Sequence, residues 1–238
     1  MVTITSDAES AAQAAAARMA AAIRSALAER RIAHLALAGG TTPRRAYEIL
    51  AAAVSDWSGV CFWLGDERML PVGDADRNDT MLQAALTRPD TDCVPRIETV
   101  ATGNPDDAAR RYEARIRERV PHGPEGLPRF DLVLLGLGED GHTASLFPGN
   151  PAIEERTRLV VPVSGAPKPP PDRVSMTIPL LSVARAIVIL ATGSGKAPPV
   201  AVLTGPARET LPSGRLPEDR LELICDPEAA SQIARSKR

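Results

Sequence analysis

The 238-residue chain has few cysteines and no long apolar segment. Its three cysteines, Cys61, Cys93 and Cys225, are odd in number and far apart, so they form no disulfide framework and no C-x-x-C zinc or redox motif. The amino terminus has no basic stretch followed by an apolar one, and no segment approaches the roughly 18 apolar residues of a membrane span. We therefore expect reduced thiols and a soluble cytoplasmic protein that binds no membrane.

An excess of charge of one sign is also missing. The chain has 28 Lys+Arg against 30 Asp+Glu, a formal net charge of -2. No overall field is available to hold nucleic acid or an anionic surface, so any basic site must be local and no nucleic-acid partner is expected. Only three of the basic residues are lysines, Lys168, Lys196 and Lys237, and a lysine in a glycine-rich loop is therefore conspicuous in this arginine-rich chain.

The chain does contain alternating helical and strand patterns. Ser6 and Glu9 form a capping-box pattern before an alanine-rich helix that extends to about Arg31. Further helices are predicted over residues 44–54, 80–87 and 105–120, and strands over residues 32–38, 60–64, 130–135, 159–163, 186–191 and 221–225. Because too few residues follow the proline cluster at 167–171 for a second core, we expect a single domain over 1–238. The alternation predicts a doubly wound, mostly parallel α/β sheet with helices on both faces.

Ligand sites in such sheets lie at the carboxyl ends of strands, so the polar residues after each strand are candidates. Gly39, Gly40 and Thr41 lead into a helix whose first N–H groups favour a phosphate or carboxylate, with a plain tight turn capped by threonine as the alternative. Asp66 and Arg68 follow the next strand. Arg68 suits a bidentate contact with phosphate and Asp66 a sugar hydroxyl or a water, unless the segment is a solvated turn.

Residues 136–141 formally match the G-x-G-x-x-G pattern of dinucleotide-binding folds. Pro148 stops any helix within two turns and no acidic residue ends the next strand, which disfavours that interpretation. Asp140 and His142 instead place a carboxylate and an imidazole two residues apart, an arrangement in which Asp140 can orient His142 as a general base. A structural histidine is the alternative, but the surrounding glycines, Gly141 among them, leave little apolar surface to bury.

Lys196 ends a Gly-Ser-Gly-Lys loop that only partly matches a P-loop, since it lacks the first glycine and the Ser or Thr that binds magnesium. Lys196 and Arg173 are candidate ligands of a phosphate monoester, with solvated surface side chains as the alternative. With three histidines and no H-E-x-x-H, no metal site is expected. No G-x-S-x-G elbow is present, and Ser145 has no motif support as a nucleophile.

In this order the loops resemble those of the 6-phosphogluconolactonase family, which is related to the glucosamine-6-phosphate deaminases and isomerases. The resemblance covers roughly residues 35–203, and its most specific element is GLGEDGHTASLFPG, supported by LAGGTTP, WLGDER and APKPPPDRVSMTIPLL. The residues after the histidine favour a lactonase over a deaminase. Two departures are mild: Arg77-Asn78 replaces a usual Ser-Asn pair, which leaves contacts near Asn78 open, and residues 174–176 replace a more aliphatic run.

The resemblance implies a Rossmann-like, glucosamine-6-phosphate isomerase-like fold and an ester hydrolase that opens 6-phospho-D-glucono-1,5-lactone in the oxidative pentose phosphate pathway, without metal or cofactor. It implies His142 as general base, with Asp140 and Asp66 in the catalytic group. The substrate would be held by the residues Gly39, Gly40, Thr41, Arg68, Gly141, Arg173 and Lys196.

Two other functions remain open at this stage. One is a phosphosugar isomerase or deaminase in which Asp66 shuttles a proton, and the other is a non-catalytic sugar-phosphate sensor. The expected partner is the small-molecule lactone, and the expected state is a monomer or a weak homodimer.

Overall fold

The computed structural model describes residues 1–88 and 93–233. The helices are α1 (Ala8–Arg30), α2 (Thr41–Ala53), α3 (Asn78–Leu86), α4 (Pro105–Arg119), α5 (Ile178–Ser182) and α6 (Ala197–Leu203), with short 3-10 helices at Pro151–Glu154, Ser194–Lys196, Arg208–Thr210 and Ser213–Arg215. The strands are β1 (Val2–Ile4), β2 (Ala33–Leu37), β3 (Val60–Leu64), β4 (Asp66–Arg68), β5 (Arg96–Glu98), β6 (Leu132–Gly136), β7 (Val160–Val163), β8 (Arg173–Met176), β9 (Ile187–Ala191) and β10 (Leu221–Cys225). No helix in these two ranges is both long enough and apolar enough to cross a bilayer.

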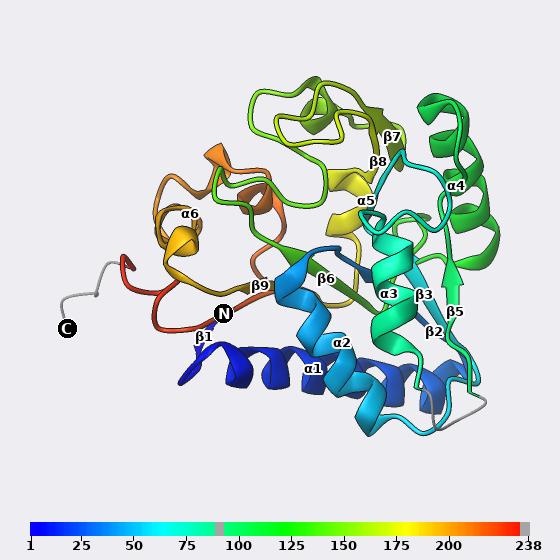
Figure 1. Ribbon diagram of the computed structural model, residues 1–238, viewed down its shortest axis with the longest axis horizontal. Coiled ribbons are helices and arrows are strands. Elements are labelled where there is room, and N and C mark those ends of the chain that lie inside the picture. The colour runs from blue at the N-terminus through cyan, green and yellow to red at the C-terminus, as the bar shows by residue number, and fades with distance from the viewer. Residues whose placement is uncertain (89–92, 234–238) are drawn as a thin grey trace.

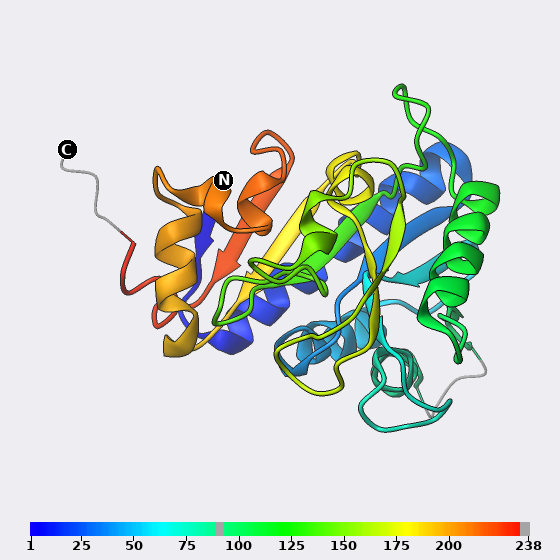
Figure 2. The same ribbon diagram turned by 90° about the horizontal axis from the view of Figure 1, so that it is seen from above.

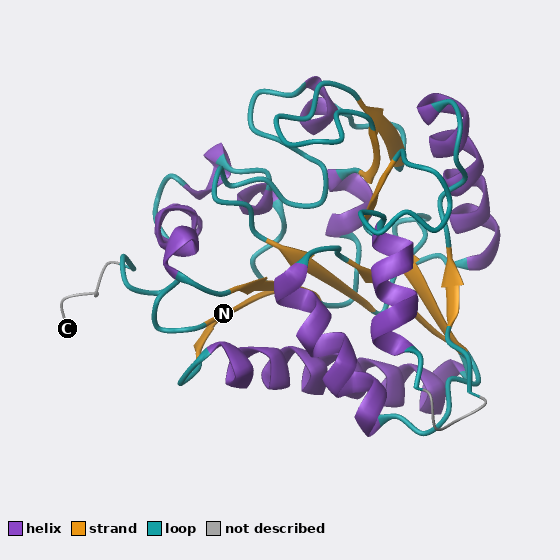
Figure 3. Cartoon of the chain, in the orientation of Figure 1, coloured by secondary structure: helices purple, strands orange, loops and turns teal. Residues whose placement is uncertain are grey.

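Seven strands form one sheet in the order β1-β10-β9-β6-β2-β3-β5, and neighbouring strands in it run parallel. Figure 2 shows these strands side by side, with β6 in green near the middle. In Figure 1, α1 and α2 lie below the sheet, while α6 and the strands β7 and β8 lie above it. Figure 3 shows the strands of the seven-stranded sheet lying between helices. The predicted doubly wound parallel sheet is confirmed.

The centre of this sheet is apolar because both of its faces are covered. Leu35 of β2 is in register with Phe62 of β3 and with Leu132 of β6, and all three side chains are buried. Each such side chain contributes about 1.5–3 kcal/mol when it leaves water. The buried central strands therefore fix the positions at which the loops begin and end.

The strand order reverses between β2 and β6. From β2 the chain adds β3 and β5 on one side, whereas β6, β9 and β10 lie on the other. The loops that leave β2 and β6 diverge at such a switch point, which opens a crevice at the carboxyl ends of these strands. The topology therefore selects one edge of the sheet for ligand binding.

A second, antiparallel sheet of order β4-β8-β7 was not predicted. The strand expected at 159–163 is present as β7, but its implied place in the parallel sheet is wrong, because it pairs antiparallel with β8. An antiparallel pair needs no crossover helix, and a loop with the proline cluster joins the two strands. Strand β4 forms where only a polar loop was expected, and it places Arg68 opposite Arg173 of β8.

Two helix starts also differ from the prediction. Helix α1 is capped by Asp7, whose carboxylate accepts a hydrogen bond from Ser10 N at 2.7 Å, and not by Ser6. The charged side chain also interacts favourably with the helix dipole. Helix α2 begins at Thr41 after Gly40, which has φ 107° and makes no side-chain cap. The threonine-capped turn considered as an alternative is therefore wrong, and the first N–H groups of α2 have no capping side chain.

Candidate active site

A pocket of about 310 Å³ opens at the carboxyl ends of the central strands. Its walls come from the loops after β2, β3, β6 and β9 and from the loop between β7 and β8. Its polar and aromatic lining includes Gly39, Gly40, Thr41, Asp66, Arg68, His142, Phe147, Lys168, Arg173 and Lys196. The structure thus gathers the predicted site residues in one place, except that Asp140 and Gly141 are not among the lining residues.

The charged groups of the wall are mostly cations. Among the lining residues that the structure describes, Arg68, Lys168, Arg173 and Lys196 share the pocket with one carboxylate, Asp66. The whole chain has a net charge of -2, so this local concentration is not a consequence of composition. Such a wall favours an anionic ligand.

His142 is oriented by Asp140. Its Nδ1 lies 2.5 Å from Asp140 Oδ1, and its backbone N–H donates to the same oxygen at 3.2 Å. Partial burial opposes the charge of Asp140, but the hydrogen bonds and charge of His142 outweigh it, and the pKa of Asp140 is lowered from its ordinary value. Because the Asp140 carboxylate accepts the Nδ1 proton, Nε2 keeps the lone pair and can act as a base.

Glycines make room for this pair. A Cβ on Gly138 would lie 2.1 Å from His142 Nδ1 and 2.5 Å from Asp140 Oδ1. Gly141 has φ 83°, and a Cβ there would lie 2.5 Å from Leu211 Cδ2. Gly141 therefore shapes the turn, and its contact with a substrate stays a prediction.

Phe147 packs against the imidazole of His142, and Arg173 packs against Phe147. The ring centroids of Phe147 and His142 are 4.6 Å apart, and the guanidinium carbon of Arg173 is 5.5 Å from the Phe147 centroid. Arg173 is only 5% exposed, and its Nε and Nη2 donate to the carbonyls of Pro170 at 3.2 Å and Lys168 at 2.9 Å. Arg173, expected as an anion ligand, thus also holds the proline loop in place.

Asp66 is held by two side chains from distant segments. Ser145 Oγ donates to Asp66 Oδ2 at 2.6 Å, and Asn78 Nδ2 donates to the Asp66 carbonyl at 2.7 Å. Ser145 is fully buried, so its hydroxyl serves Asp66 and does not face the pocket. Gly39 approaches Asn78 so closely that a Cβ there would lie 1.8 Å from Asn78 Oδ1. Asn78, whose contacts the sequence left open, therefore packs against the first glycine loop and holds Asp66.

Glu67 lies between Asp66 and Arg68 in β4, but unlike them it does not line the pocket. Its buried carboxylate accepts backbone N–H groups of Arg68 at 2.7 Å, Asn78 at 2.7 Å and Asp79 at 2.9 Å. Burial raises the pKa of Glu67 to about 7. Arg77, the departure noted in the sequence, is also buried and makes a bidentate ion pair with Asp79. These residues anchor β4 to the N-terminus of α3.

Sequence reasoning missed Lys168 and Phe147. The rarity of lysine that drew attention to Lys196 applied equally to Lys168, which lies within the proline cluster. Lys237 lies outside the described residues. Phe147 carried no signal of its own, because an apolar residue after a turn is ordinarily part of the core.

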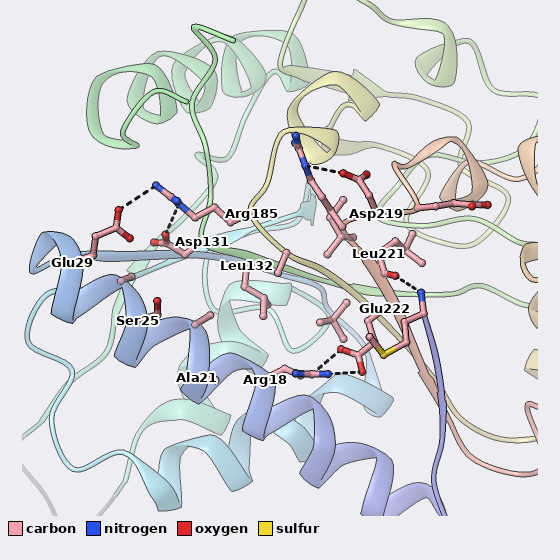
Figure 4. Close-up of a pocket in the computed structure, with 18 of the residues that line it drawn as sticks. Arg18, Ala21, Ser25, Glu29, Asp131, Leu132, Arg185, Asp219, Leu221 and Glu222 are labelled. Carbon is pink, nitrogen blue, oxygen red and sulfur yellow. Dashed lines mark hydrogen bonds and ion pairs between the residues drawn. The ribbon is translucent and has the colours of Figure 1, made fainter. Parts of the chain in front are cut away.

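A second cavity of about 470 Å³ lies between α1 and the amino ends of β6, β9 and β10 (Figure 4). Its charged groups pair with one another: Arg18 with Glu222 at 2.7 Å and Arg185 with Asp131 at 3.4 Å. Ligands of open parallel sheets bind at the carboxyl ends of the strands. The pocket around His142 is therefore the better candidate.

Comparisons with known proteins agree with this site. The family model described as glucosamine-6-phosphate isomerases/6-phosphogluconolactonase matches residues 6–225. The chain belongs to this family. A 6-phosphogluconolactonase of Streptomyces coelicolor is 39% identical over 97% of this chain and 93% of its own length, and one of Synechocystis is 36% identical over 82% and 84%.

Among solved structures, the 6-phosphogluconolactonase of Leishmania guyanensis matches with a TM-score of 0.82 and 28% identity, covering 99% of both chains. The predicted family, its fold and the expectation of an enzyme of the lactonase type are thereby confirmed.

Proposed function

We propose that the protein hydrolyses 6-phospho-D-glucono-1,5-lactone to 6-phospho-D-gluconate, the lactone step of the oxidative pentose phosphate pathway. The observation that carries the proposal is the His142–Asp140 pair on a pocket wall whose other charged groups are mostly cations. A phosphate monoester supplies the anion for such a wall, and an activated ester is a group that one oriented base can open. The names of the similar proteins support the same reaction.

Phosphate binding is assigned to the cations and to the N-terminus of α2. The buried Nε of Arg68 has no hydrogen-bond partner in the part of the chain that the structure describes. Burial lowers the pKa of Lys196, so a bound anion would favour its charged form. The first N–H groups of α2 add donors at the same edge of the pocket. A phosphate held at this edge orients the lactone ring. Binding energy from the phosphate, which is remote from the reacting carbonyl, thereby positions that carbonyl for attack.

The chemical step then needs only proton transfer and charge stabilisation. His142 Nε2 takes a proton from water as its oxygen attacks C1 of the lactone, and Asp140 stabilises the imidazolium that forms. The imidazolium next gives the proton to the ring oxygen as the C1–O5 bond breaks. Backbone N–H groups of the glycine loops stabilise the oxyanion, and Asp66 accepts a sugar hydroxyl or polarises the water. We propose no metal ion for this step.

A coupled assay tests the proposal. Glucose-6-phosphate dehydrogenase generates the lactone in the assay mixture, and the rate at which the lactone disappears is compared with the spontaneous rate. The proteins compared are wild type, His142→Ala and the control His122→Ala. His122 is exposed and lies outside the pocket. We expect His142→Ala to lower kcat by about 10²–10⁴ with little change in KM, because it removes a group used mainly in the transition state. His122→Ala should match wild type.

Other outcomes discriminate between the functions. Wild-type kcat in a folded His142→Ala protein contradicts the general base. No acceleration of lactone opening, together with turnover of glucosamine 6-phosphate, supports the isomerase or deaminase with Asp66 as proton carrier. Binding of 6-phosphogluconate without turnover of either substrate supports the sensor.

A further inference from the structure

The loop between β7 and β8, residues 164–172, brings an additional lysine to the pocket. Lys168 and Pro169 line the pocket together with Arg68, His142 and Lys196. The Lys168 side chain is exposed and takes part in no hydrogen bond or ion pair within residues 1–88 and 93–233. Its ammonium group is thus available to a ligand.

Hydrogen bonds hold the backbone of this loop in place. Besides the Arg173 hydrogen bonds to the Lys168 and Pro170 carbonyls, Ala166 N donates to the Pro171 carbonyl at 3.0 Å. The end of the loop is tied to the segment after β4, where Met69 N donates to the Asp172 carbonyl at 3.0 Å. Because the backbone is already in place, a ligand at Lys168 must order only one side chain, which limits the entropic cost of binding.

Lys168 also acts on Lys196. Burial is the main reason that the pKa of Lys196 is lowered, Glu139 opposes the effect, and the charge of Lys168 adds to it. Because both ammonium groups line the same pocket, they favour a ligand with more than one negative charge. A phosphate monoester carries about −1.5 to −2 at neutral pH.

We propose that Lys168 is a specificity-determining residue that contacts the 6-phosphate together with Lys196 and thereby distinguishes the phosphorylated lactone from the unphosphorylated one. Arg173 is a positioning residue for this contact, since it holds the Lys168 carbonyl. The inference rests on the proposed function, because it assigns the part of the substrate that Lys168 binds. It places one further cation on the phosphate beyond those expected from the sequence.

The test compares two lactones. kcat and KM are measured for 6-phosphogluconolactone and for glucono-1,5-lactone with wild type, Lys168→Met, Lys168→Arg and Arg24→Met. Arg24 is exposed on α1 outside the pocket, and its substitution removes the same unit of charge. We expect Lys168→Met to raise KM for the phosphorylated lactone about tenfold with kcat within about twofold. The unphosphorylated lactone should show no change, Lys168→Arg should recover most of the loss, and Arg24→Met should match wild type.

Calorimetry with 6-phosphogluconate and gluconate provides a readout independent of turnover. Lys168→Met should weaken binding of 6-phosphogluconate about tenfold and leave gluconate unaffected. Unchanged affinity and KM in Lys168→Met, or an equal loss on both lactones, overturns the inference. A wild type that opens neither lactone overturns the proposed function instead, and the calorimetry then still decides whether Lys168 binds the phosphate.

Discussion

At the residue scale, the proton transfer depends on which nitrogen of His142 is free. Asp140 Oδ1 accepts a hydrogen bond from His142 Nδ1 at 2.5 Å. An asparagine at position 140 has no charge to stabilise the imidazolium, and its amide N–H can reverse the tautomer of the imidazole. We expect Asp140→Asn to lower kcat about 10²-fold or more with little effect on KM, measured in the coupled assay. Asp219→Asn, an exposed carboxylate at the opposite edge of the sheet, serves as control. Near-wild-type kcat in Asp140→Asn shows that Asp140 does not orient the base.

Gly138 acts at the same scale through the space it leaves empty. Its φ lies outside the left-handed region, so alanine is compatible with the backbone, but the added Cβ would lie 2.1 Å from His142 Nδ1. We expect Gly138→Ala to displace the imidazole and lower kcat about 10²-fold while the unfolding temperature changes little. A Cβ on Gly65 would come no closer than 3.6 Å to its neighbours, so Gly65→Ala should stay within a few-fold of wild type. Equal kcat for the two variants contradicts this account of Gly138.

At the scale of elements, Glu67 joins β4 to α3. Its pKa is raised from 4.5 to about 7 by burial, so the folded state binds the proton more tightly than the unfolded state does. The contribution of Glu67 to stability therefore falls as the pH rises from about 4.5 to about 7 and is constant above that range. Glu67→Gln removes this titration. We expect the unfolding temperature of Glu67→Gln to fall less than that of wild type between about pH 5 and about pH 8. Parallel profiles for the two proteins would show that Glu67 does not titrate in this range.

At the scale of the whole molecule, the strand order decides which of two cavities binds the ligand. A product present at about 100 times its Kd stabilises the folded state by about 2.7 kcal/mol, which is roughly 5–10 °C in unfolding temperature for a chain of this size. We expect 6-phosphogluconate to produce this shift in wild type and in Arg185→Ala, which alters the cavity between α1 and the amino ends of the strands (Figure 4). The shift should be largely lost in Lys196→Ala. The reverse pattern places the ligand in the cavity beside α1.

The sequence by itself determined the features that depend on neighbours along the chain. Apolar runs such as Val60–Leu64 and Ile187–Ala191 predict buried strands because a parallel sheet covers both faces of each strand. The residues just after these strands must then meet at one edge, which is why Gly39, Asp66 and His142 were candidates. The His142–Asp140 pair was also predictable, since its members are two positions apart in one loop.

Only the tertiary structure decided the contacts between distant segments. Strands β1, β4 and β5 have three residues each, too few to show a period, and the pairing of β4 with β8 joins segments more than 100 positions apart. The same holds for Ser145 on Asp66, for Asn78 against Gly39 and for the place of Lys168 and Lys196 in the lining of one pocket. Local patterns report which residues are buried or follow a strand. Which of them meet is set by the strand order and by the packing of loops, to which every part of the chain contributes.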